Sequence, residues 1–100
     1  MAVWSGCTVE ILDEGGRALF RDGDCDVQLE GGELLVCYWD EAGAVVFAGR
    51  ADASGGYELW CRSRPRRAAL RASPGGAGFE GSWREGDARG TWRIHLPGGG

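Results

Sequence analysis

Apolar and polar residues alternate along most of this chain. The alternation is clearest over residues 79–96, where Phe79 and Trp83, and after a turn Trp92 and Ile94, share one face. Residues 85–90, rich in Gly and charged residues, separate the two halves. Period-two alternation around such a turn is typical of a β-hairpin with one buried face. Because an isolated hairpin is marginal in water, this one needs more sheet to pack against.

The rest of the chain predicts that sheet. Turn-forming pairs and clusters such as Gly31-Gly32 separate short apolar runs, and the two prolines around residues 66–72 exclude a stable helix there. In the first run, Val3, Cys7, Val9 and Ile11 occupy odd positions of one strand. A turn is expected at 21–24. The predicted strands before the hairpin cover residues 3–12, 17–20, 25–29, 33–39, 44–51, 57–62 and 66–72.

Eight or nine short strands joined by short turns indicate an all-β domain. Local hairpins without a long crossover favour an antiparallel meander that closes into a barrel, since closure removes exposed sheet edges. A two-sheet β-sandwich is the alternative. We expect residues 1–96 to form one domain and residues 97–100, mostly Gly, to form a flexible tail.

Composition bounds the cellular context. The first residues lack the basic and apolar regions of a secretory signal, and no apolar run is long enough to span a membrane. The four cysteines form no CxxC motif, so we expect reduced thiols in a cytoplasmic protein. All eleven basic residues are Arg, a bias typical of a GC-rich, bacterial-like genome. The sequence indicates no cofactor.

Charge is distributed unevenly along the chain. Residues 1–60 hold twelve acids and three Arg, a net charge of −9, whereas residues 61–100 hold three acids and eight Arg, a net charge of +5. Pairing with the protein's own acidic strands is one interpretation of the basic cluster, and an acidic partner, including a second copy, is another. The overall charge of −4 disfavours nucleic acid. The candidate anion- or partner-binding cluster is Arg62, Arg64, Arg66, Arg67 and Arg71.

Residues 33–39 are apolar on both faces, and residues 44–51 are nearly so. Tyr38 precedes Trp39 and Leu59 precedes Trp60, so one aromatic or apolar side chain of each pair must point away from the core. An outward apolar patch of this kind marks an interaction surface. Sequence alone leaves the register open, and a slip of one residue would invert the faces. The candidate outward set is Leu35, Cys37, Trp39, Val46 and Trp60.

A calcium site is a weaker candidate. Its spacing follows an EF-hand loop, except that Val27 stands where the sharp turn needs Gly, and no helices flank it. A solvated acidic strand is the simpler interpretation. The candidate ligands are Asp22, Asp24, Asp26, Glu30 and Glu33.

Catalysis has little support, because the single His95 is not paired by spacing with any cysteine. We therefore expect a small interaction or accessory module that binds a protein partner or itself, through the aromatic face or the Arg cluster. The alternative is a barrel that binds a small apolar or anionic ligand. An enzyme is the third hypothesis.

Overall fold

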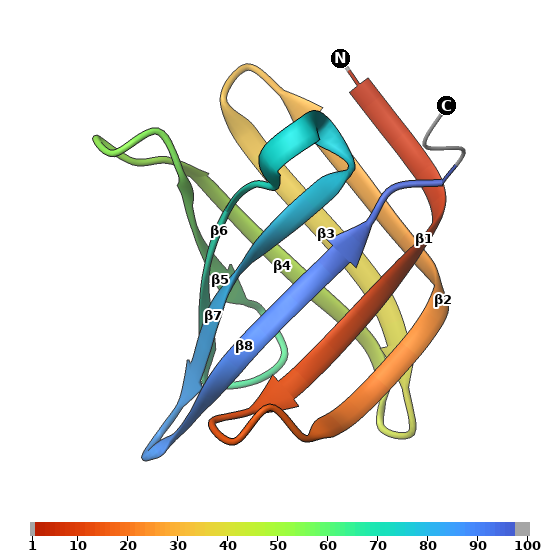
Figure 1. Ribbon diagram of the computed structural model, residues 1–100, viewed down its shortest axis with the longest axis vertical. Coiled ribbons are helices and arrows are strands. Elements are labelled where there is room, and N and C mark those ends of the chain that lie inside the picture. Colours follow the sequence, from red (N-terminus) through yellow and green to blue (C-terminus); the bar gives the residue numbers. More distant parts are fainter. Residues whose placement is uncertain (1, 98–100) are drawn as a thin grey trace.

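The chain folds into one closed barrel. The computed structural model describes residues 2–97, and in that range eight antiparallel strands follow one another in sequence order around the barrel. Pairing of β8 with β1 closes it (Figure 1), which confirms the predicted meander barrel and excludes the sandwich. A short 3-10 turn, Pro74–Gly76, joins β6 to β7. The strands are β1 (Ala2–Asp13), β2 (Ala18–Glu30), β3 (Glu33–Asp40), β4 (Gly43–Ala51), β5 (Tyr57–Cys61), β6 (Arg66–Ala72), β7 (Gly78–Glu85) and β8 (Ala88–His95).

The inward-facing half of each strand fills the barrel. Tyr38, Phe47 and Trp92 are each about 1% exposed, and the rings of Phe47 and Trp92 lie 4.9 Å apart. Phe79, Trp83 and Ile94 are buried with them, which confirms the predicted inner face of the last hairpin. No polar or charged residue between positions 2 and 97 is buried. The interior is therefore an apolar core, and burial of this surface stabilises the fold.

Glycines make room for the large aromatic residues of neighbouring strands. Gly90 lies opposite Trp83 on β7, and the Trp83 indole nitrogen donates a hydrogen bond to the Leu12 carbonyl at 2.9 Å. A Cβ atom on Gly90 would lie 2.0 Å from that carbonyl oxygen and 2.8 Å from the indole nitrogen. Gly90 is thus required for the contact that joins β7 to β1 across β8.

The predicted turn at 21–24 is wrong, because β2 runs without interruption from Ala18 to Glu30. Asp22 lies opposite Val9 and Arg21 opposite Glu10, and a register shift between Cys7 and Val9 places a bulge at Gly23 and Asp24. The bulge accommodates this turn-prone segment within the strand, with Asp22 half-buried and Asp24 exposed.

Two local predictions also fail. Val3 is 57% exposed rather than sharing the buried face of β1, because the register with β2 shifts between Trp4 and Cys7, where Gly6 has a φ of 70°. The last turn is shorter than predicted, since β7 extends to Glu85 and β8 starts at Ala88. Residues 98–100 of the predicted tail lie outside the described residues.

We expect Gly90→Ala to destabilise the protein by about 2–3 kcal/mol, because the added methyl group collides with backbone that cannot move independently. Gly23→Ala is the matched control, since nothing lies within 4 Å of a Cβ at that position. Urea unfolding followed by tryptophan fluorescence measures both variants. Equal unfolding midpoints for the two would contradict this account of Gly90.

Candidate binding surface

The strand register places a continuous apolar surface on the outside of β3, β4 and β5. Leu34, Val36 and Tyr38 point into the core, so the alternate residues of β3 point outward. Trp39 and Trp60 are 62% and 48% exposed. Neighbouring positions across the three strands are Trp39 with Ala44, Cys37 with Val46, and Leu35 with Ala48 and Trp60. We call this set of seven residues the apolar face: Leu35, Cys37, Trp39, Ala44, Val46, Ala48 and Trp60.

The structure thus brings together all five residues of the candidate outward set, and adds Ala44 and Ala48 to them. Single exposed apolar residues are common, but a contiguous patch with two exposed tryptophans is not. The remaining exposed large apolar side chains of the described chain, Val3 and Leu19, belong to β1 and β2. The apolar face is therefore the main unexplained hydrophobic feature of the outer surface.

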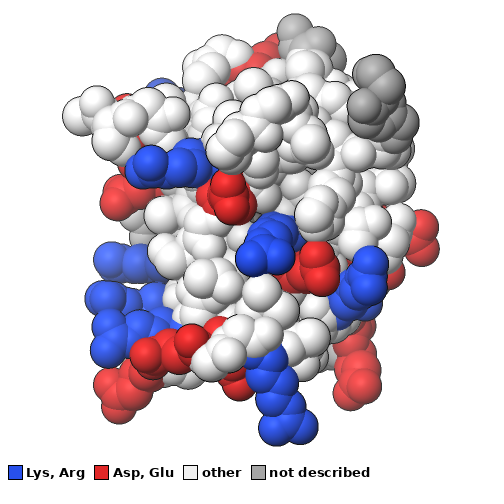
Figure 2. All heavy atoms as spheres, viewed as in Figure 1, with Lys and Arg blue, Asp and Glu red and all other residues white. Residues whose placement is uncertain are grey.

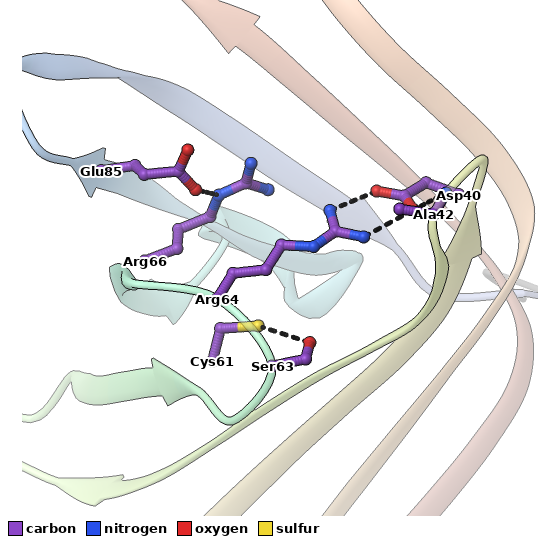
Figure 3. A network of polar contacts seen from close by, with 7 residues as sticks. All are labelled: Asp40, Ala42, Cys61, Ser63, Arg64, Arg66 and Glu85. Atoms are coloured by element: carbon purple, nitrogen blue, oxygen red, sulfur yellow. Dashed lines mark hydrogen bonds and ion pairs between the residues drawn. The ribbon is translucent and has the colours of Figure 1, made fainter.

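The Arg cluster predicted from sequence does not form one site. The Arg64 guanidinium makes a two-pronged ion pair with the Asp40 carboxylate, and Arg66 Nε donates to Glu85 Oε1 at 3.1 Å (Figure 3). The Arg64 hydrogen bonds hold the pKa of Asp40 down at about 2. Arg66 also lies 5.5 Å from the centre of the Trp83 ring. These two arginines are engaged by the protein's own acidic and aromatic groups.

Arg71 belongs to a row of alternating charges that runs across the strands. It lies opposite Glu80, which lies opposite Arg93, and the row continues through Glu10 to Arg21. Acidic and basic side chains alternate accordingly in a diagonal band across the front of Figure 2. Opposite charges on facing cross-strand positions stabilise a sheet. We call these five residues the alternating row.

A second row carries like charges instead. Arg67 lies opposite Arg84, and Arg84 lies opposite Arg89. Arg89 pairs with Glu14 at 3.3 Å, but within residues 2–97 neither Arg67 nor Arg84 has an ion-pair partner. Facing like charges destabilise a sheet. We call Arg67, Arg84 and Arg89 the arginine row.

The arginine row lines a shallow groove beside the apolar face. Trp60 forms one wall, and the Arg67 guanidinium lies 6.0 Å from the centre of its ring. Ser82 and Glu58 also line the groove. Sequence analysis missed Arg84 and Arg89, because they join Arg67 only through the register of β6, β7 and β8. Arg84 follows the buried Trp83, so period-two alternation is the signal that places it on the outer face.

Charged residues border the apolar face on both sides. Asp26 on β2 lies opposite Cys37, and the Arg62 backbone N–H donates to the Val46 carbonyl at 3.1 Å. Both side chains are exposed, and neither has an ion-pair partner within residues 2–97. A single cross-strand row therefore reads Asp26, Cys37, Val46, Arg62: acidic, apolar, apolar, basic.

The calcium candidates lie on β2 and at the start of β3. A register shift lies between Asp22 and Cys25, so Asp22 lies opposite the buried Val9 whereas Asp26 lies opposite the outward Cys37. Glu30 lies opposite Glu33 at the hairpin end. Among the described residues, no three acidic, His or Cys side chains gather as a metal ion requires.

His95 and the buried cysteine thiols, the groups considered for nucleophilic chemistry, lie on different sides of the barrel wall. His95 Nε2 lies 2.9 Å from Glu10 Oε1 on the outer surface, whereas Cys7, Cys25 and Cys61 are buried. Desolvation raises the pKa of the Cys25 thiol and of the Cys37 thiol, which lowers the thiolate fraction. This arrangement suits packing, with Cys37 alone partly exposed among the described cysteines.

We expect Arg84→Glu to raise the melting temperature by about 2–4 °C, because the new carboxylate would lie between Arg67 and Arg89. Arg93→Glu is the matched variant in the alternating row, and it should lower the melting temperature by a similar amount. Thermal unfolding followed by circular dichroism measures both. Shifts of the same sign would contradict the distinction between the two rows.

Comparison with known proteins supplies no function for this surface. The chain matches no protein-family model, and neither a curated protein nor a solved structure is significantly similar to it. No helix within residues 2–97 has the length and apolarity needed to cross a lipid bilayer.

Proposed function

We propose that this protein is a small interaction module that binds another protein surface through its apolar face. The observation that carries the proposal is the contiguous outward patch of β3, β4 and β5, with Trp39 62% and Trp60 48% exposed. Tryptophan in such a patch is a typical energetic centre of a protein interface. Bordering charges at Asp26 and Arg62 match the polar rim that surrounds such centres.

The barrel favours this role for a physical reason. Each outward side chain of the apolar face stands on a strand whose alternate residues are locked in the core, for example Tyr38 beside Trp39. A surface held in this way loses little conformational entropy when a partner binds. The smaller entropy loss makes the binding free energy more favourable. The interior is filled by side chains such as Phe47 and Trp92, so a ligand enclosed in the barrel is less well supported.

A photo-crosslinking amino acid at position 39 should form adducts with bound protein in extracts of the source cells. The same amino acid at position 93, in the alternating row, is the control, because that row is polar and lies outside the apolar face. Mass spectrometry identifies the adducts. Adducts at position 39 that are no more frequent than those at position 93 would contradict the proposal.

The arginine row supports a second candidate function, the binding of an anionic group. Arg67, Arg84 and Arg89 stand on facing positions of neighbouring strands, and a bound carboxylate or phosphate would relieve the repulsion between their charges. The adjoining Trp60 links this groove to the apolar face, so one acidic partner can contact both.

Inorganic phosphate is the simplest probe of the arginine row. It should raise the melting temperature of the wild-type protein more than sodium chloride does at equal ionic strength, because binding stabilises the folded state. Arg84→Glu should abolish this difference, and Arg93→Glu should retain it. Equal effects of the two salts on the wild-type protein would remove the support for an anion site.

We also propose a reducing compartment, as in the cytoplasm. All four cysteines are free thiols in the described chain, and the partly exposed Cys37 would be open to oxidation elsewhere.

A further inference from the structure

We infer that the partner of the apolar face is a second copy of this chain, related by a two-fold axis that lies parallel to the strands, between β3 and β4. The inference rests on the proposed function and names its partner. Its basis is the order of residues across the face. When the same row is read in the opposite direction on a second copy, acidic positions meet basic ones and apolar positions meet apolar ones.

The row Asp26, Cys37, Val46, Arg62 carries the argument. A two-fold axis between β3 and β4 exchanges β2 with β5 and β3 with β4 across the interface. Asp26 of each copy then faces Arg62 of the other, and Cys37 faces Val46. The two ion pairs form at the rim, while the apolar centre is covered. This is the self-complementary contact that a two-fold dimer requires.

Charge selects this axis over the perpendicular one. A two-fold axis perpendicular to the strands would set each strand against the same strand of the second copy, so that β2 would face β2. The exposed Asp24 and Asp26 would then lie near the same acids of the second copy, and Arg62 near Arg62. Such like-charge contacts oppose association. The parallel axis replaces them with opposite charges.

Side-chain size is complementary about the same axis. Trp39 lies beside Ala44, and Leu35 beside Ala48, on the paired strands β3 and β4. Exchange of β3 with β4 therefore places Trp39 over Ala44, and Leu35 over Ala48, of the second copy. Packed sheets keep their strand directions within about 30° of each other, which a parallel axis satisfies. Large-to-small contacts allow the two convex faces to approach closely.

The two charged residues at the borders of the apolar face are free to pair with a second copy. Asp26 and Arg62 are both exposed and lack an ion pair within residues 2–97, in contrast to Arg64 and Arg66. The sequence asymmetry of −9 against +5 thus has a local counterpart at the two borders of the apolar face.

Charge reversal with rescue tests the inference. Sedimentation equilibrium of the wild-type protein should show a dimer whose dissociation constant rises with salt. Asp26→Arg and Arg62→Asp should each raise the dissociation constant about tenfold, because each dimer then holds two like-charge contacts. The double variant D26R/R62D should restore the wild-type value, because the exchanged charges attract again. Trp39→Ser should raise the constant about a hundredfold.

Matched controls separate these effects from changes in fold or net charge. Leu19→Ser removes an exposed apolar residue outside the apolar face, and D87R/R17D exchanges charges in two turns. Both controls should dimerise as the wild type does. The reaction of Cys37 with a maleimide supplies an independent readout, since it should slow as the protein concentration rises and the face becomes covered.

A strict monomer at millimolar concentration, with a Cys37 reaction rate independent of concentration, would overturn the inference. A dimer that survives Trp39→Ser, or that the double variant fails to restore, would also overturn it. Adducts of another protein at position 39, found with a strict monomer, would leave the proposed function standing. Failure of both experiments would remove the proposed function as well.

Discussion

The register of strand pairing around the closed barrel is the constraint on which the rest of the structure depends. Because successive side chains alternate between the core and the outside, a slip of one residue would expose the core. Closure by β8 and β1 removes the free edges at which such a slip could occur. Trp83 reinforces this closure, since its hydrogen bond to Leu12 spans β8 and only Gly90 leaves space for it.

The same register assigns each outward residue to a row across the strands, and the rows differ in what they do. The alternating row from Arg71 to Arg21 sets opposite charges on facing positions, and Arg64 and Arg66 form ion pairs with the protein's own acids. The arginine row instead sets like charges on facing positions, and the apolar face exposes apolar side chains to water. Natural proteins retain such unsatisfied local arrangements mainly at functional sites.

Alternation in the sequence was sufficient to predict the barrel, the inner face of the last hairpin and the exposure of the Trp39 and Trp60 region as one alternative. It could not predict the bulge near Gly6 that exposes Val3, because a bulge depends on pairing with β2. Nor could it predict which residues of the Arg cluster form ion pairs within the chain and which belong to other rows. Asp40 reaches Arg64 from 24 positions away, and Arg84 reaches Arg67 only across the β6–β7 ladder.

The central claim is that the apolar face recognises its own copy. The most direct measurement is a series of ¹H–¹⁵N correlation spectra recorded over increasing protein concentration. The account predicts that backbone amide shifts change mainly along β3 and β4 and at Asp26 and Arg62, while the alternating row stays constant. Concentration-dependent shifts confined to the alternating row, or no shifts up to millimolar protein, would contradict it.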